Sequence, residues 1–105
     1  MTTKTTVSHE DAVIRRLRNN TEFAAEYLKA ALDDTEEPQV LLLALRHIAE
    51  ARGGVAKVAK VAGIKRESLY RALSARGNPR LSTLMAVTKA IGLKLTVDTV
   101  RPVKS

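Results

Sequence analysis

The stretch from Val55 to Ser74, VAKVAKVAGIKRESLYRALS, constrains the fold of this chain more than any other part of it. Its pattern predicts a short helix, a tight turn at Gly63 and a second helix. The second helix places Arg66, Glu67 and Arg71 on positions that cannot all be buried. This arrangement is typical of a helix-turn-helix whose second helix enters the major groove of DNA.

Several packing requirements of such a unit are met at fixed offsets. A small residue is needed where the two helices touch, and Ala59 stands there. Four places later Gly63 supplies a residue that tolerates positive φ, and Ile64 follows it as an apolar plug for the corner. The remaining packing positions are Val58, Ala62, Leu69, Ala72 and Leu73. An unrelated helical hairpin with a glycine turn is the alternative interpretation.

The outward side chains of the second helix follow from the helical period. Arg66 and Arg71 can each present a guanidinium to guanine O6 and N7, so we predict that they read bases. Glu67 can accept from cytosine N4 or, alternatively, orient Arg71 one turn away. The predicted phosphate contacts are Lys65, Ser68, Tyr70, Ser74 and Arg76. For Tyr70, a half-buried ring with its hydroxyl outward is an equal alternative.

The charge of the chain is unevenly distributed. The net charge is +7, with six Lys/Arg against nine Asp/Glu in residues 1–50 and twelve against two in residues 51–105. A strongly basic half predicts a polyanionic partner, and DNA, RNA or an anionic membrane would each satisfy it. The spacing of the second helix favours double-stranded DNA and disfavours RNA and membrane. A generic solvated surface is the remaining alternative.

Composition limits the fold class and the kinds of functional site that the chain can form. The 105 residues suit one domain, and with only 3% aromatic residues the core must consist of Ala, Leu, Val and Ile, which favours helices. The absence of cysteine excludes disulfides and cysteine-ligated zinc, and it fits a cytoplasmic protein. No apolar run reaches the ~20 residues of a membrane span, and the N-terminus lacks the apolar core of a signal peptide.

His9 and His47 are isolated, and the sequence shows no set of residues typical of a catalytic site. We therefore expect no catalytic residue, metal or cofactor, and no enzyme activity.

Hydrophobic periodicity predicts six helices. The first follows a cap at Ser8, after weakly ordered residues 1–7, and Gly92 ends the last. The expected ranges are 9–18, 22–33, 36–51 after a cap at Thr35, 55–62, 65–75 and 82–91. Val40 and Met85 are predicted to lie in the core. We divide the chain into an N-terminal extension, residues 1–20, and a helix-turn-helix domain, residues 21–105.

The last part of the chain has a different period. Leu93 to Asp98 alternates apolar and polar residues, which predicts a short β-strand. A single strand has unpaired backbone groups and should find a partner. A second copy of the chain would give a dimer whose recognition helices reach half-sites roughly 34 Å apart. The Thr-rich N-terminus and a strand of another protein are the alternatives.

Several stretches carry a resemblance to a known family. They are Tyr27-Leu28, Ala30–Leu32, Ala44-Leu45, Ile48-Ala49, Ala51–Gly53, Gly63-Ile64, Arg66–Ser74, Gly77–Pro79, Thr83-Leu84 and Ala90–Leu93. With these, residues 35–97 resemble a lambda-repressor/Cro-like helix-turn-helix domain. More narrowly, residues 23–97 resemble the addiction-module antidote family, the antitoxins related to the HigA branch. Residues 1–20 lie outside the resemblance.

The resemblance implies an all-α fold of five to six helices with the short C-terminal strand. It also implies an antitoxin that binds a RelE/ParE-like toxin and represses its own operon as a dimer on a palindromic operator. Ala56-Lys57 stands where many relatives carry a Thr-Gln-type pair, so we expect Lys57 to replace the usual phosphate contact there. A stand-alone or phage-type transcriptional regulator without a toxin partner is the alternative function.

Overall fold

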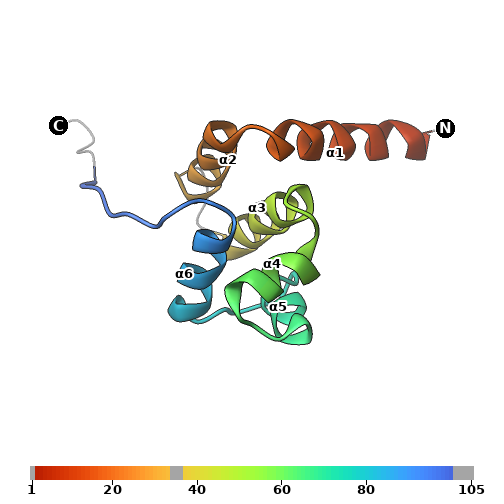
Figure 1. Cartoon of the computed structure of the whole chain (residues 1–105). Coiled ribbons are helices and arrows are strands. Elements are labelled where there is room, and N and C mark those ends of the chain that lie inside the picture. Colours follow the sequence, from red (N-terminus) through yellow and green to blue (C-terminus); the bar gives the residue numbers. More distant parts are fainter. Residues whose placement is uncertain (1, 34–36, 101–105) are drawn as a thin grey trace.

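A computed structural model describes residues 2–33 and 37–100 of the chain, with side chains from residue 9 onward. Within these residues the chain forms six helices and no strand (Figure 1). They are α1 (Thr2–Arg18), α2 (Thr21–Asp33), α3 (Pro38–Ala51), α4 (Val55–Ala62), α5 (Arg66–Ala72) and α6 (Leu81–Ala90).

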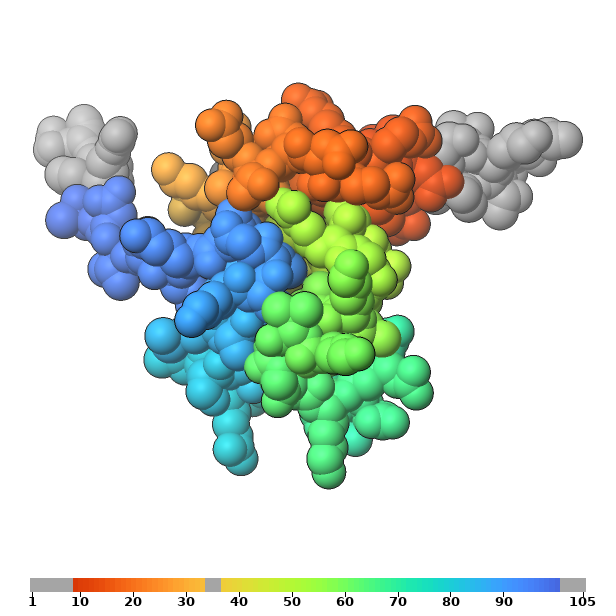
Figure 2. All heavy atoms as spheres, viewed as in Figure 1, coloured from red at the N-terminus to blue at the C-terminus, as the bar shows by residue number. Residues whose placement is uncertain are grey.

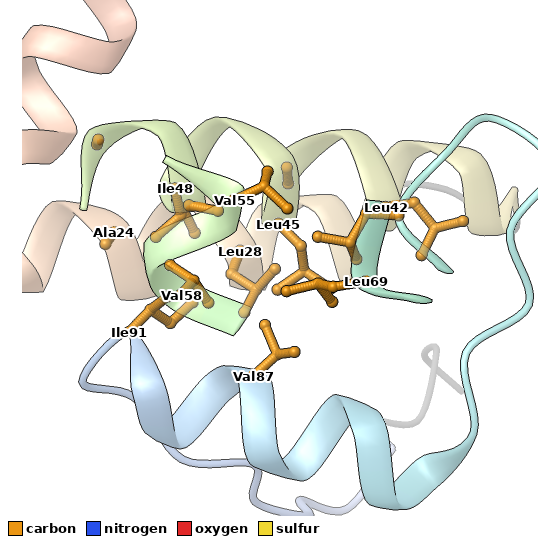
Figure 3. Close-up of a cluster of buried hydrophobic side chains, with 14 of the residues drawn as sticks. Ala24, Leu28, Leu42, Leu45, Ile48, Val55, Val58, Leu69, Val87 and Ile91 are labelled. Atoms are coloured by element: carbon orange, nitrogen blue, oxygen red, sulfur yellow. The ribbon is translucent and has the colours of Figure 1, made fainter. Parts of the chain in front are cut away.

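α3 is the central helix of the fold. It packs against α1, α2 and α4, while α4 also packs against α5 and α6. Pro38 stands in its first turn, where the fixed φ of proline suits a helix start and no backbone N–H is lost. Leu45 and Ile48 are almost completely buried on its inward side. Figure 3 shows α2, α4 and α6 contributing Leu28, Val58 and Val87 to the same cluster.

The turn between α4 and α5 is formed as the sequence predicted. Gly63 follows the last helical residue with φ of 74°, a left-handed conformation that costs glycine little. The Ile64 N–H donates to the Ala59 carbonyl over 2.9 Å, and the Gly63 N–H donates to the Lys60 carbonyl over 3.3 Å. This pair of bonds is a Schellman motif, which satisfies carbonyls left free at the helix end.

The largest differences from the predicted helix ranges are in α1 and α5, while the bounds of α3 and α6 differ by one or two residues. α1 already begins at Thr2, so Ser8 lies inside the helix and does not cap it, although threonine is a weak helix former. α5 is shorter than predicted, with Lys65 and Leu73 as its flanking residues. Thr35, the predicted cap of α3, lies outside the described residues, and Glu37 occupies the position before the helix.

The predicted C-terminal strand is wrong for the single chain. Residues 93–100 follow α6 without regular secondary structure (Figure 1). A strand exists only as part of a hydrogen-bonded ladder, and no second strand is present in the described residues to complete one. The predicted stop of α6 is confirmed, because Gly92 adopts φ of 88° directly after the helix end.

Two predicted core residues are exposed. Met85 is 55% exposed and Val40 is 39% exposed. α6 instead buries Val87 and Thr88, and Ile91 is buried just after its end. Met85 lies two residues from Val87, on another side of the helix. The buried Thr88 hydroxyl, which the sequence pattern did not single out, donates to the Leu84 carbonyl over 2.9 Å. Such a bond lets a polar side chain occupy a core position.

Candidate nucleic-acid interface

One side of α5 is anchored in the core and the other is open to solvent. Leu69 is 0% exposed, and Leu73, directly after the helix, is 1% exposed. The exposed residues of α5 are Arg66, Glu67, Ser68, Tyr70 and Arg71. The structure thus brings five of the predicted site residues onto one short helix.

The other predicted residues surround α5. Lys65 is exposed at its N-terminal flank, and Lys57 is exposed on α4. Ser74 lies beyond the C-terminal end of α5, so it does not share the helical face as predicted, and Arg76 lies in the loop that follows. The Ser74 hydroxyl is already used, because it donates to the Arg71 carbonyl over 2.7 Å.

The structure bears on the two alternatives left open for this helix. In the described part of the chain no ion pair joins Glu67 to Arg71, so the Glu67 carboxylate does not orient that guanidinium here. Tyr70 is 50% exposed, which agrees with a half-buried ring and equally with a ring available to a ligand. Both interpretations of Tyr70 therefore stay open.

The surface around α5 is strongly basic. Residues 55–90 contain nine charged side chains, of which Glu67 is the single acidic one. All eight cations are exposed: Lys57, Lys60, Lys65, Arg66, Arg71, Arg76, Arg80 and Lys89. Within the described residues none of their side chains makes a hydrogen bond or an ion pair. These charges are therefore available to an anionic ligand.

Arg46 of α3 supports the position of α5, a role that sequence reasoning missed. Its Nη1 donates to the Leu73 carbonyl over 3.0 Å, at the C-terminal end of α5. A cation at this end of a helix satisfies a free carbonyl and interacts favourably with the helix dipole. Arg46 stands among the apolar residues of α3, and a cation in such a stretch could have indicated this structural role.

Two glycines fit closely beside the site. A Cβ at Gly77 would overlap the backbone carbonyl of Ala72, so the loop after α5 can approach the helix end only because residue 77 has no side chain. A Cβ at Gly53 would stand 2.6 Å from Cδ of Lys57, because the aliphatic stem of Lys57 lies over Gly53. Sequence reasoning did not identify either glycine as a contact point.

A different cluster joins α1, α2 and α3. The Tyr27 hydroxyl and His47 Nδ1 are 2.7 Å apart, and His47 Nε2 lies 3.6 Å from a carboxylate oxygen of Glu10. Burial, together with the negative charge of Glu10, raises the pKa of the Tyr27 hydroxyl above its ordinary value. The guanidinium of Arg16 lies 4.1 Å from the centre of the Phe23 ring, a cation–π contact. His47 therefore has a polar partner on each side and is not isolated.

Comparison with known proteins places the chain in a family. Residues 10–99 match the family model described as "Probable addiction module antidote protein". The chain belongs to this family. It is also 43% identical to an uncharacterized protein of Haemophilus influenzae over 72 residues, which are 69% of this chain and 72% of that relative. No solved structure matches the chain. Among the described residues, no helix is both long enough and apolar enough to span a bilayer.

Proposed function

We propose that this antidote-family protein is a sequence-specific DNA-binding repressor and the antitoxin of a type II toxin–antitoxin module. In this proposal it neutralises a RelE/ParE-like toxin in the cytoplasm and, as a homodimer on a palindromic operator, represses its own operon. The DNA-binding part rests on one observation: α5 has one buried side and one exposed side. Leu69 is fully buried, and five polar or charged side chains are exposed.

The geometry of α4 and α5 supports major-groove binding. The two short helices meet at the Gly63 turn, which is the arrangement of a helix-turn-helix with α5 as its recognition helix. Arg66 and Arg71 are exposed and unpaired among the described residues, so each guanidinium is free to bond guanine O6 and N7. Lys65, Ser68, Tyr70 and Arg76 are accessible for phosphates, as is Lys57, whereas Ser74 has its hydroxyl committed.

The family description supports the antitoxin part, because an antidote requires a toxin to act on. α1 and α2 lie at the end of the molecule opposite α5 (Figure 2). Residues 1–50 carry a net charge of −3, whereas α1 and α2 taken alone carry five Lys/Arg against five Asp/Glu. In this proposal the acidic N-terminal half contacts a basic toxin while α5 stays on DNA.

Footprinting and gel-shift titration on the DNA upstream of the gene test the repressor part. Protection of a palindromic site, with competitor DNA of random sequence leaving the complex intact, is the expected result. A protein that binds the upstream fragment no better than random DNA at 0.15 M salt would refute sequence-specific repression. The salt concentration is part of the test, because phosphate contacts alone give affinity that falls steeply with salt.

Co-expression with the product of the adjacent open reading frame tests the antitoxin part. The expected results are co-purification of the two proteins and loss of growth inhibition when the antidote is supplied. A neighbour that neither binds nor inhibits growth would overturn the antitoxin part while leaving DNA binding intact. That outcome would instead support the stand-alone regulator.

A further inference from the structure

We propose that Gly53 is a positioning residue for the DNA contact of Lys57. Because residue 53 has no side chain, the stem of Lys57 lies across the connection between α3 and α4, and this seat holds the Lys57 ammonium ready for a phosphate. The inference deepens the proposed DNA binding and rests on it. It gives the α3–α4 connection a part in recognition, in addition to its part in the fold.

The backbone at Gly53 is fixed by the end of α3, in the short connection that leads into α4 (Figure 1). The Gly54 N–H donates to the Ala49 carbonyl over 2.9 Å, and the Gly53 N–H donates to the Glu50 carbonyl over 3.3 Å. This pair of bonds is a Schellman motif, and Gly53 occupies its positive-φ position with φ of 106°. The surface under the Lys57 stem is therefore held in place by α3.

Lys57 reaches this surface from the first turn of α4. Side chains of a helix lean toward its N-terminus, and Lys57 is the third residue of α4, so its stem turns back toward the connection. Its Cδ lies 2.6 Å from the place that a Cβ at residue 53 would occupy, and its Cβ and Cε each lie 3.6 Å from that place. Any L side chain at residue 53 would therefore displace the stem from this path.

The other glycines with positive φ show that the contact is particular to Gly53. Gly54 has φ of 105°, Gly63 of 74° and Gly92 of 88°, yet a Cβ at any of them would meet nothing within 4 Å. Backbone conformation alone explains glycine at those three positions. Gly53 combines positive φ with a lysine stem lying against it, so it has a second reason to be glycine.

A lysine held in this way binds a phosphate at a lower entropic cost. A free lysine stem has many rotamers, and fixing them on binding weakens association. Lys57 is exposed, and its ammonium makes no hydrogen bond or ion pair within the described residues. The seat thus restricts the stem and leaves the charge available. Loss of the seat should weaken DNA binding about two- to tenfold, although the charge itself is retained.

A double-mutant cycle separates this role from backbone strain. Operator affinity and its salt slope are measured for the wild type, Gly53→Ala, Lys57→Ala and the double variant. Gly53→Ala should weaken binding about two- to tenfold and move the salt slope toward that of Lys57→Ala, because the displaced ammonium no longer meets its phosphate. In the Lys57→Ala background the same change should have no further effect on binding, since the remaining Cβ lies at an ordinary contact distance of 3.6 Å.

Gly54→Ala is the matched control for the strain. It adds the same methyl group at the next residue and at nearly the same φ, but that methyl group touches nothing within 4 Å. It should lower the free energy of unfolding as Gly53→Ala does, because alanine is strained at positive φ. Its effect on DNA binding should be the same with and without the Lys57 side chain.

A measurement on the unaltered protein covers the case in which Gly53→Ala does not fold. NMR of the free protein should show nuclear Overhauser effects between the Gly53 Hα and Lys57 Hδ protons. Side-chain relaxation should show a more restricted stem for Lys57 than for Lys60, an exposed lysine of the same helix.

Two results would overturn the proposal: Gly53→Ala weakening DNA binding equally with and without the Lys57 side chain, or a Lys57 stem as mobile as that of Lys60 with no contact to Gly53. The cycle is repeated on random DNA, because phosphate contacts carry no sequence information. Coupling of Gly53 to Lys57 on both DNAs, with no preference for the operator, would refute sequence-specific repression alone. Specific operator binding without that coupling would refute the positioning role alone.

Discussion

The helix pair α1–α2 and the helix pair α4–α5, which lie on different sides of α3, are held together by different means. α4 and α5 meet through apolar residues such as Val58 and Leu69, with a glycine turn between them. α1 and α2 are joined at Asn20, whose Oδ1 accepts from the Phe23 N–H over 2.9 Å. That end also uses polar contacts, with His47 between Tyr27 and Glu10.

The comparison shows that charged side chains stabilise the α1–α2 end, whereas those at the α5 end remain available to bind a ligand. Around α5 the exposed charged side chains take no part in holding the helices, a role left to apolar residues and to Arg46 of α3, so eight exposed cations stay free for a ligand. Around α1 and α2 several charged groups are already engaged, among them Glu10, Arg16 and Arg52. The α5 end should therefore respond to salt mainly in its binding, and the α1–α2 end mainly in its stability.

The largest expected effect comes from removing the apolar anchor of α5. Leu69→Ala should lower the free energy of unfolding by about 2–5 kcal/mol, because the side chain is fully buried and its loss leaves a cavity. Urea denaturation followed by circular dichroism measures the loss. Met85→Ala is the control, since that side chain is exposed, and a comparable loss there would contradict the burial described for α6.

The next effect separates base contacts from phosphate contacts. Arg66→Ala and Arg71→Ala should each cost about 1–3 kcal/mol of operator binding and relax base preference at one position. Lys57→Ala and Lys60→Ala should weaken binding to all sequences and reduce the salt slope by about 1. Titrations on operator and random DNA at two salt concentrations measure both quantities. Equal losses on both DNAs from the arginine variants would place the recognition face elsewhere.

A smaller effect tests the support that α3 gives to α5. Arg46→Met keeps an unbranched apolar stem but removes the hydrogen bond to the Leu73 carbonyl, and we expect a loss of about 1.5 kcal/mol in stability. Operator affinity should fall while the salt slope stays at the wild-type value, because Arg46 does not meet a phosphate in this proposal. A salt slope reduced by about 1 would instead show a direct phosphate contact.

The smallest effect concerns the polar cluster at the other end. Tyr27→Phe should cost about 1 kcal/mol at pH 7, because the hydroxyl loses its bond to His47. Tyr70→Phe, at an exposed tyrosine, is the control and should leave stability at pH 7 unchanged.

The same variant should also change the response to alkaline pH. The raised pKa of Tyr27 means that the native state keeps its proton when the unfolded chain has lost it. The wild-type protein should therefore lose stability as pH rises above about 10, the ordinary tyrosine pKa. Tyr27→Phe should show a shallower loss between pH 9 and 11 in urea unfolding. An identical slope in the two proteins would contradict the burial of this hydroxyl.

The sequence predicted the parts of the fold that depend on local chemistry. Gly63 and Gly92 end helices where the pattern required positive φ, and Leu69 and Leu73 are buried at the helical period. The sequence analysis failed where contacts between residues far apart in the chain determine the structure. The pairing of Arg46 with the Leu73 carbonyl, twenty-seven residues away, has no local signature. The strand at residues 93–98 failed for another reason, because alternation describes a surface suited to pairing and does not supply the partner.

Arg46 and His47 are consecutive residues of α3, yet their side chains reach different helices. Arg46 contacts the end of α5, and His47 contacts Tyr27 of α2 and Glu10 of α1. Successive residues of a helix differ by about 100° in direction, which sends the two side chains apart. A rotation of α3 about its axis therefore cannot release one contact and preserve the other. The rotation of α3 about its own axis therefore sets how the α1–α2 pair is oriented relative to α5.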